Sequence, residues 1–499
     1  MNQQLTRILC VLLLFCSPLY SLAEKVFDFN STCQKAYNEV TSLKLSAAQS
    51  TITEARRQNP DNLIPDFLEN YIDFFELFFN EDPTQYEQRK PHFDTRLDKL
   101  AEGPDSSPYY RYCRAIVTLQ KAAVAIKFGE RWSAGWDFRR GFSLIKDNRK
   151  AFPSFAPNDL IYGPLQVAVG TIPNGYKWLA SLFGMKGSIK DGMQIFRSFL
   201  NSNDPQAKQF LNEAQFYYCY LVFYIENKPD EVLQYIAGNK LDVVNNHLFA
   251  YMAANLGINN KRNEYGKQVI LFRNPSAEYM ATSVWDFELG YARMRHLELP
   301  DAIRSFERFL THFKGRFYVK DVYQKLSWCY YLQGNTAAAE NARALILKKG
   351  ATDTDADKQA QREAKNNTWP NALLLKARLL SDGGYNKEAL AILEGKNTEY
   401  FAKPEEQLEF AYRLARIYDD MGHDAAAIQA YLAAIKLGEH RPEYFAARAA
   451  LQLGYMYERQ GKKAMAMAFY QQCLDMDDHE YKDSLDQKAK AGIARCKGQ

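Results

Sequence analysis

A pattern of seven positions recurs in the second half of the chain and constrains its fold more than any other feature. The last copy has successive offsets of 1, 3, 4, 5, 4 and 3 residues between Leu453, Gly454, Tyr457, Gly461, Ala466, Tyr470 and Cys473. The same offsets recur 39 residues upstream in Leu414, Ala415, Tyr418, Gly422, Ala427, Tyr431 and Ala434. A period of this length predicts an array of similar units rather than separate globular domains.

The spacing within each copy predicts two packed helices. The first helix carries a bulky residue, a small residue and a tyrosine at i, i+1 and i+4, so the second helix can approach closely. Gly422 and Gly461 stand where the first helix ends, as expected for a residue with positive φ. No helix pair buries both of its faces alone, so neighbouring pairs must stack. The predicted fold class is therefore all-α.

Weaker copies extend the pattern towards the N-terminus. They comprise Ala377, Leu380, Gly384, Ala389 and Leu393; Leu326, Ser327, Tyr330, Gly334 and Ala339; Leu289, Gly290, Ala302, Phe306 and Phe309; and Ala36, Ala48, Ile52 and Ala55. Leu297 and Leu43 replace the turn glycine in the last two copies. The polar stretch 352–367 interrupts the array and is expected to be a loop or a short exposed helix.

The pattern resembles the tetratricopeptide repeat, most clearly over residues 283–475. The resemblance implies a tetratricopeptide-like helical-hairpin solenoid, wound as a right-handed superhelix. Such a solenoid presents a long concave surface to a protein or peptide partner.

The repeat register places a set of side chains, rich in aromatic residues and arginine, along that concave surface. These types are enriched at binding hot spots. Packing between adjacent repeats is the alternative interpretation. The predicted partner-binding residues are Phe287, Tyr291, Trp328, Tyr331, Arg378, Tyr412, Arg416, Tyr455 and Arg459, with Leu374 beside Arg378. The paired arginines resemble those of repeats that clamp a terminal carboxylate, but the asparagines of such repeats are missing.

Residues 131–200 depart from the repeat and are rich in Gly and Trp. This segment resembles the N-terminal region of a eukaryotic tetratricopeptide family that includes the inclusion-body-clearance outer-membrane proteins. Ile172-Pro173 matches the family's turn, whereas Met185 and Ser188 depart from its Gly-Phe-x-Gly-Asp element. Gly170 to Lys177 nearly spells a phosphate loop, but Tyr176 separates Gly from Lys, so a turn between packed helices is favoured.

The first 23 residues have the form of a secretory signal peptide. Arg7 precedes the short apolar run 8–16, and Ser21-Leu22-Ala23 fits cleavage after Ala23. Acylation at Cys16 is the alternative, and only this would give membrane association. The protein is therefore expected to be exported, and periplasmic or envelope-associated if bacterial.

The remaining chemistry favours binding over catalysis. The seven histidines are scattered, and HExxH, GxSxG and GxGxxG motifs are absent, so no enzyme activity, metal site or cofactor is predicted. The formal net charge of +4 does not indicate nucleic-acid binding. Six cysteines lie beyond residue 23 without regular spacing and are expected to be buried, although Cys473 and Cys496 could pair if adjacent helices bring them together.

The predicted organisation is a signal peptide (1–23), an atypical helical region (24–200), degenerate helical repeats (201–275) and a tetratricopeptide array (276–499). We expect a non-catalytic exported scaffold for protein–protein or protein–peptide interaction, with an unknown oligomeric state. The alternative is an envelope glycan- or nutrient-binding protein on a similar framework. Exposed aromatic residues near Trp132 and Trp136 would favour it.

Overall fold

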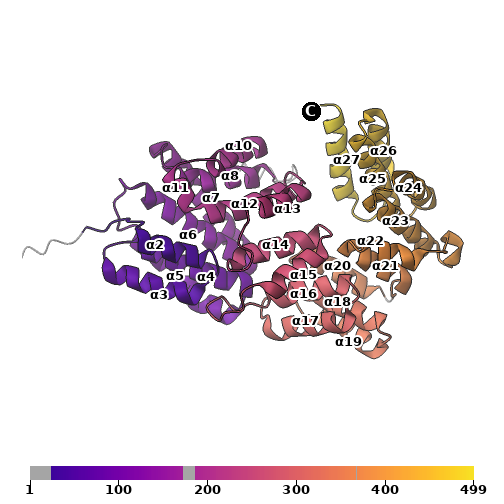
Figure 1. The fold of residues 1–499 in the computed structure, drawn as a ribbon, viewed down its shortest axis with the longest axis horizontal. Coiled ribbons are helices and arrows are strands. Elements are labelled where there is room, and N and C mark those ends of the chain that lie inside the picture. The colour runs from indigo at the N-terminus through magenta and orange to yellow at the C-terminus, as the bar shows by residue number, and fades with distance from the viewer. Residues whose placement is uncertain (1–23, 172–185, 367, 499) are drawn as a thin grey trace, which may run out of the picture. The chain divides into compact units, whose positions relative to one another are not determined.

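The computed structural model describes residues 24–171, 186–366 and 368–498, and helices dominate these ranges (Figure 1). Their one β-type pairing is an isolated bridge between Val26 and Asn62. The described chain divides into two compact units, one of residues 24–78 and 84–215, the other of residues 79–83 and 216–498. The predicted all-α fold is confirmed. The signal sequence, Cys16 and Ile172-Pro173 lie outside the described residues.

The first unit is built of helices that pack around buried aromatic rings. Tyr37, Tyr71, Tyr112 and Phe210 are fully buried, with edge-to-face contacts such as that of Tyr37 on Phe210 at 5.0 Å between centroids. The helices are α2 (Ser31–Val40), α3 (Leu45–Gln58), α4 (Ile64–Asn80), α5 (Pro83–Leu100), α6 (Pro108–Lys127), α7 (Arg131–Ala151), α8 (Pro157–Gly170), α10 (Ile189–Leu200) and α11 (Pro205–Gln209).

The glycines of the atypical segment permit a close crossing of α8 and α10. A Cβ on Gly163 would lie 2.9 Å from the carbonyl oxygen of Gly192, and a Cβ on Gly192 would lie 2.7 Å from that of Gly163. Backbones can approach this closely only where side chains are absent. Ser188 caps α10 by accepting a hydrogen bond from the Asp191 amide at 3.2 Å.

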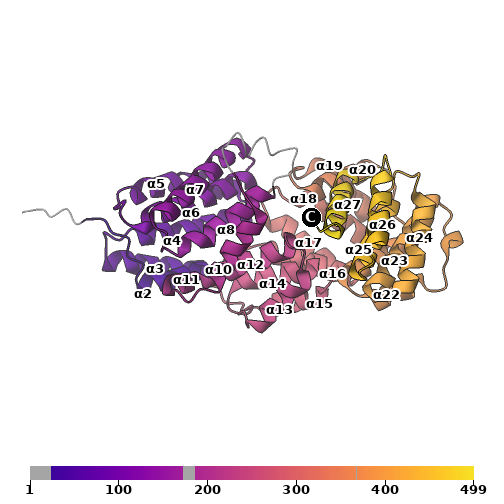
Figure 2. The same cartoon turned by 90° about the horizontal axis from the view of Figure 1, so that it is seen from above.

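The second unit is a series of antiparallel helix pairs, and its last helices lie side by side in both views (Figures 1 and 2). Helix α12 (Leu211–Tyr224) crosses the division between the units. The others are α13 (Pro229–Gly238), α14 (His247–Asn259), α15 (Asn263–Phe272), α16 (Val284–Arg295), α17 (Leu299–His312), α18 (Val319–Leu332), α19 (Thr336–Lys348), α20 (Asp355–Lys365), α21 (Ala372–Gly383), α22 (Asn386–Leu393), α23 (Pro404–Asp420), α24 (Asp424–Gly438), α25 (Phe445–Arg459), α26 (Lys463–Asp475) and α27 (Lys482–Cys496), with the short 3-10 turn η2 (Thr398–Tyr400).

The turn residue of each predicted hairpin adopts the left-handed conformation. Gly422 and Gly461 both have φ of 74°. Leu43 and Leu297, which replace glycine, have φ of 60° and 59°. The hairpin geometry therefore imposes positive φ even where a Cβ makes it unfavourable by roughly 1 kcal/mol. Lys261, in the α14–α15 turn, has φ of 57° and lies within the predicted degenerate repeats, where the sequence pattern did not locate a turn residue.

The small residue of the first helix makes room for an aromatic ring of the second. A Cβ on Gly454 of α25 would lie 2.3 Å from the ring of Tyr470 on α26, and a Cβ on Gly290 of α16 would lie 2.4 Å from the ring of Phe306 on α17. Tyr470 also packs on Gly492 of α27, where an added Cβ would lie 2.4 Å from its ring. The small position of the first helix is thus covered by the aromatic ring of the second.

The polar interruption is a helix rather than a loop. Thr354 caps α20 by accepting a hydrogen bond from the amide of Asp357 at 3.0 Å. Asp357 and Ala360 are fully buried where α20 packs on α18 and α19, so the helix is not exposed all round. The six cysteines of the described chain are buried free thiols, and Cys473 and Cys496 do not pair.

Candidate binding pocket

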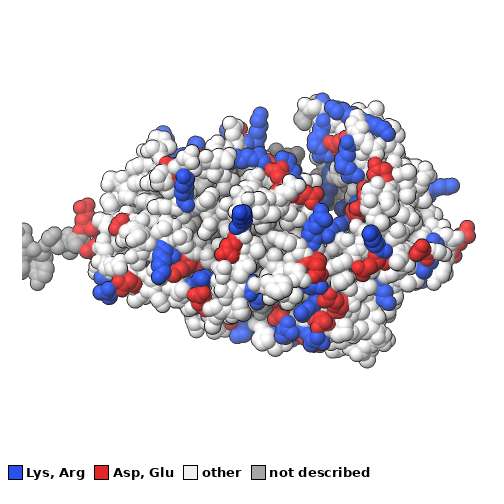
Figure 3. Space-filling view, in the orientation of Figure 1, with Lys and Arg blue, Asp and Glu red and all other residues white. Residues whose placement is uncertain are grey.

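A pocket in the second unit collects polar side chains from four helices and three connecting segments. Its volume is about 380 Å³. Figure 3 shows Lys and Arg side chains inside the hollow beside α27. The lining residues are Lys261, Arg378, Ser381, Asp382, Tyr412, Arg413, Arg416, Tyr444, Arg448, Tyr481, Ser484 and Leu485.

Three of the lining arginines recur at an interval of 35 residues, namely Arg378 on α21, Arg413 on α23 and Arg448 on α25. The turn glycines of the same hairpins are spaced by 38 and 39 residues. Relative to the turn glycine of its hairpin, each arginine therefore lies about one helical turn (3.6 residues) closer to the start of its helix than the arginine of the preceding hairpin. The result is an oblique row of guanidinium groups across three stacked helices.

The α14–α15 turn reaches the pocket because Gly384 leaves space for it. A Cβ on Gly384 would lie 2.0 Å from the carbonyl oxygen of Lys261. The ammonium group of Lys261 forms an ion pair with Asp420, at the end of α23. Residues more than 100 positions apart in the chain thus meet at one wall of the pocket.

Some of the cations are already paired with carboxylates on their own helices. Arg413 binds Glu409, four residues earlier on α23, with a closest approach of 2.9 Å. Arg416 contacts Asp419 at 3.4 Å and Asp420 at 3.3 Å. These ion pairs fix the guanidinium groups and reduce their free charge.

Among the residues that line the cavity, positive charges outnumber negative ones. Asp382 is the one carboxylate among the lining residues, beside five cations. Burial alone would raise the pKa of Asp382, but the charges of Arg378, Arg413 and Arg295 lower it. Asp382 is therefore ionised, and its contact with Arg378 is long, at 3.6 Å.

Arg448 has no acidic partner. Among the described residues its guanidinium makes no ion pair and no hydrogen bond, and its Nε is buried without a hydrogen-bond partner. A buried N–H group without an acceptor costs about 1–3 kcal/mol. The structure therefore leaves at this position a hydrogen-bonding capacity that the protein itself does not use.

Three tyrosines place further donors around the same space. Tyr412 is only 5% exposed, and Tyr444 packs edge-to-face on Tyr481 with 5.2 Å between ring centroids. None of the three hydroxyls has a hydrogen-bond partner among the described residues. Burial raises the pKa of Tyr412, and burial with the charge of Glu480 raises that of Tyr481 to about 12. Both phenols are therefore neutral donors at physiological pH.

The pocket brings together three of the nine predicted partner-binding residues: Arg378, Tyr412 and Arg416. Trp328 is adjacent, since the guanidinium of Arg378 lies over its ring at 5.3 Å from the centroid. Leu374 is fully buried in the core.

The other predicted residues lie elsewhere in the second unit. Phe287 packs on Tyr291 at 5.0 Å, and the hydroxyl of Tyr291 donates to Asp321. Tyr331 stacks on Trp369 at 4.7 Å and donates to the Pro370 carbonyl. These rings make contacts of the kind that hold repeats together.

Tyr455 and Arg459 do not line the pocket. The ring of Tyr455 packs edge-to-face on Tyr470 at 5.7 Å, and Arg459 pairs with Asp419 at 3.0 Å. In the 39-residue repeat, Tyr455 occupies the position of Arg416, and Arg459 occupies that of Asp420. Tyr455 and Arg459 therefore lie about one helical turn further along α25 than Tyr412 and Arg416 lie along α23.

Sequence reasoning missed several lining residues, among them Lys261, Arg413, Tyr444, Arg448 and Tyr481. The 35-residue interval of the arginines was a signal for two of them. Tyr444 and Tyr481 precede helices and fall outside the seven-position pattern.

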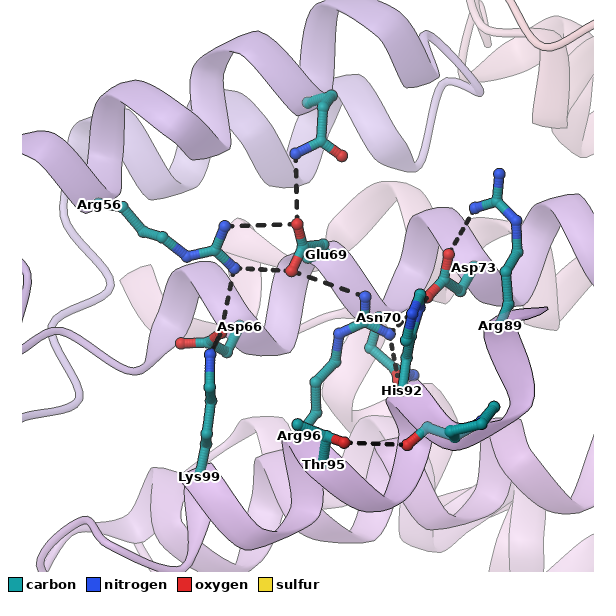
Figure 4. Close-up of polar contacts among 12 residues, drawn as sticks. Arg56, Asp66, Glu69, Asn70, Asp73, Arg89, His92, Thr95, Arg96 and Lys99 are labelled. Atoms are coloured by element: carbon teal, nitrogen blue, oxygen red, sulfur yellow. Dashed lines mark hydrogen bonds and ion pairs between the residues drawn. The ribbon is translucent and has the colours of Figure 1, made fainter.

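A second charged cluster lies in the first unit, between α3, α4 and α5 (Figure 4). Arg56 contacts Asp66 at 3.0 Å and Glu69 at 2.7 Å, and Lys99 contacts Asp66 at 3.2 Å. Burial alone would raise the pKa of Glu69, but the hydrogen bonds and charge of Arg56, together with the charge of Arg96, lower it to about 2.

The same cluster continues along α4 to Asp73. This carboxylate is 3% exposed and binds Arg96 at 2.7 Å and Arg89 at 2.5 Å. Nδ1 of His92 lies 2.9 Å from its Oδ2. Every labelled charged side chain in Figure 4 has an opposite charge beside it, so the cluster serves to join helices.

Neither cluster has the composition of a metal centre. In the part of the chain that the structure describes, no group of three or more His, Cys, Asp or Glu side chains is placed to hold a metal ion.

No helix among the described residues is long and apolar enough to cross a membrane.

Comparison with known proteins locates two repeats. The family model "Tetratricopeptide repeat" matches residues 408–438, which cover most of α23 and all of α24, and residues 447–480, which cover α25 and α26. No curated protein sequence matches the chain significantly. The crystal structure of the APC/C hetero-tetramer Cut9-Hcn1 aligns with 92% of this chain and 95% of that chain, at 12% identity and a TM-score of 0.28. By the match to the family model, the two hairpins that supply Tyr412, Arg413, Arg416 and Arg448 are tetratricopeptide repeats.

Proposed function

We propose that this protein is a non-catalytic, exported scaffold that binds a protein or peptide partner through the concave face of its helical array. Tetratricopeptide repeats support a role in protein–protein interaction. The observation that carries the proposal is the pocket, in which successive repeats present Tyr412, Arg416 and Arg448 to one space. Arginine and tyrosine are the residue types that dominate binding hot spots.

Export is part of the proposal and depends on residues 1–23. Mass measurement of the mature N-terminus tests it. Cleavage after Ala23 gives a chain that begins at Glu24, whereas acylation at Cys16 leaves a lipid-modified cysteine at the N-terminus. An unprocessed chain would contradict export by this route.

Pull-down from envelope extracts tests the binding face. The comparison is between the wild-type chain and the double variant Tyr412→Ala, Arg416→Ala. A matched control, Tyr400→Ala with Arg308→Ala, alters an exposed tyrosine and an exposed arginine outside the pocket. We expect a specific protein band to be lost with the pocket variant and kept with the control. Equal recovery with all three proteins would contradict binding through this face.

The pocket variant must be shown to fold, because Tyr412 is buried. Thermal unfolding followed by circular dichroism provides this control. Tyr412→Phe removes only the hydroxyl and keeps the ring packing, so this variant is expected to fold. If it captures less partner than the wild type, the loss is due to binding and not to misfolding.

A second candidate function, glycan or nutrient binding, is favoured by two exposed indole rings in the first unit. Trp132 is 75% exposed and Trp136 is 56% exposed. Trp136 also lines a cavity of about 460 Å³, whose lining includes the polar residues Glu130, Ser133 and Asp137. A flat aromatic face beside hydrogen-bonding groups suits a sugar ring.

Tryptophan fluorescence titration with neutral oligosaccharides tests this candidate. If it is correct, the emission changes on binding, and Trp136→Ala abolishes the binding while leaving capture of a protein partner unchanged. Sugar binding without any protein partner would replace the scaffold proposal, and no fluorescence change with any oligosaccharide would remove the candidate.

A further inference from the structure

The pocket of the second unit holds more hydrogen-bond donors than the protein satisfies. The Arg448 guanidinium has no acidic partner, and Arg378 has only the 3.6 Å contact with Asp382. The hydroxyls of Tyr412, Tyr444 and Tyr481 are also without partners among the described residues. Donors that converge on one space call for an acceptor with several oxygens and a negative charge.

The number of donors decides which anion fits. An ionised carboxylate offers two oxygens and about four acceptor positions. A guanidinium alone carries five N–H donors, and here it stands beside three phenols. A tetrahedral ester group has three terminal oxygens, and a phosphate ester carries a charge between about −1.5 and −2 near neutral pH. It therefore offers more acceptor positions to Arg448, Arg378 and the tyrosines than a carboxylate does.

The size and walls of the cavity fit such a group on a side chain. The volume of about 380 Å³ exceeds what a single oxyanion fills, so the side chain that bears it also finds room. The ring of Tyr444 lies between those of Tyr412 and Tyr481, with centroid separations of 6.3 and 5.2 Å. These rings give an apolar wall for the carrier side chain, with their hydroxyls as donors.

We propose that this pocket recognises a phosphate or sulfate ester on a side chain of the partner protein. The inference rests on the proposed scaffold function and specifies the group that the partner presents. Arg448 and Arg378 bind the ester oxygens, and the Tyr412 hydroxyl adds a hydrogen bond. Arg413, Arg416 and Lys261 are held by their own ion pairs, so the charge that meets the ester comes mainly from Arg448 and Arg378.

Fluorescence anisotropy with the full chain and a set of labelled peptides tests the proposal. The peptides share Gly-Ser flanks and differ at one position, which is phosphotyrosine, sulfotyrosine, glutamate or tyrosine, and all are measured at one ionic strength. We expect the two esters to bind at least about tenfold more tightly than the glutamate peptide, as charge-assisted bonds to additional oxygens imply. Equal binding of glutamate and ester peptides would overturn the proposal.

The variants address the donors one at a time. Arg448→Gln is expected to weaken ester binding about tenfold and Tyr412→Phe about threefold to tenfold. Arg308→Gln and Tyr400→Phe, outside the pocket, should leave it unchanged. Ester affinities of Arg448→Gln and Tyr412→Phe that equal the wild type, in chains with wild-type melting temperatures, would overturn the assignment of the site.

Two further experiments separate a free phosphate ion from an ester on the partner, and failure of the ester proposal from failure of the scaffold proposal. Inorganic phosphate should compete with the ester peptides, and if phosphate binds while both ester peptides do not, the pocket serves a free ion and the assignment to a partner's group is wrong. Extracts treated with phosphatase and sulfatase should lose the captured protein. If capture still depends on Tyr412 and Arg416 but survives this treatment, the scaffold function stands and the ester proposal falls.

Discussion

The two arginine clusters of this protein differ in how completely their charges are paired. Between α3, α4 and α5, every arginine and lysine of the cluster contacts a carboxylate of Asp66, Glu69 or Asp73. In the pocket of the second unit, Arg448 lacks an acid and Asp382 faces several cations. A fully paired cluster joins helices, whereas an unpaired cation keeps interaction capacity for a ligand. Paired charge therefore indicates structure, and unpaired charge indicates binding.

The largest expected effect is on the stability of the fully paired cluster between α3, α4 and α5. Asp73→Ala leaves Arg89 without a carboxylate and the buried Arg96 with only its longer contact to Glu69, at 3.6 Å. Removing one member of a buried ion pair costs about 3–5 kcal/mol, because the remaining charge is uncompensated. Urea unfolding should show a lower midpoint with an unchanged slope. A loss below about 1 kcal/mol would mean that the cluster does not stabilise the helices.

A pH effect of intermediate size is expected from Glu69. Its folded pKa of about 2 lies below the ordinary value of 4.5. The lowered pKa contributes up to about 3 kcal/mol above pH 4.5, and this contribution is lost as the pH falls towards 2.

Unfolding free energies of wild type and Glu69→Gln, measured between pH 6 and pH 2, check the Glu69 prediction. The wild-type curve should fall more steeply over the lower part of this range. Parallel curves for the two proteins would show that Glu69 titrates normally.

The smallest effect, and the one that most sharpens the comparison, concerns Arg448. Because its Nε is buried without a partner, Arg448→Gln should change the unfolding free energy by less than about 1 kcal/mol, and in the direction of greater stability. Thermal and urea unfolding in ligand-free buffer measure this change. Destabilisation by more than about 2 kcal/mol would show that Arg448 has a structural role like that of Arg96.

The hairpins and their turns could be predicted because they depend on local spacing. Gly422 and Gly461 adopt the positive φ that their positions imply, and Leu43 and Leu297 adopt it as well. Degenerate repeats were predicted over 201–275, but the turn at Lys261 was not located within them, because lysine carries no preference for positive φ. The crossing at Gly163 and Gly192 was visible only as glycine-rich composition, since its cause is contact between helices distant in sequence.

The candidate site was predicted only in part. Arg378, Tyr412 and Arg416 follow from the repeat register, which fixes the face of each first helix. Lys261 and Tyr481 could not follow from it, because their distance from α23 depends on how the hairpins stack.

The fixed offsets of small, aromatic and glycine positions are enough to specify helical hairpins, because these positions act within a single pair of helices. Which charges are paired depends on the tertiary structure. Arg56 and Arg448 are indistinguishable as letters, but one meets Asp66 and Glu69 from a neighbouring helix and the other meets none. Long-range electrostatics depends on distances between elements, which local spacing does not fix.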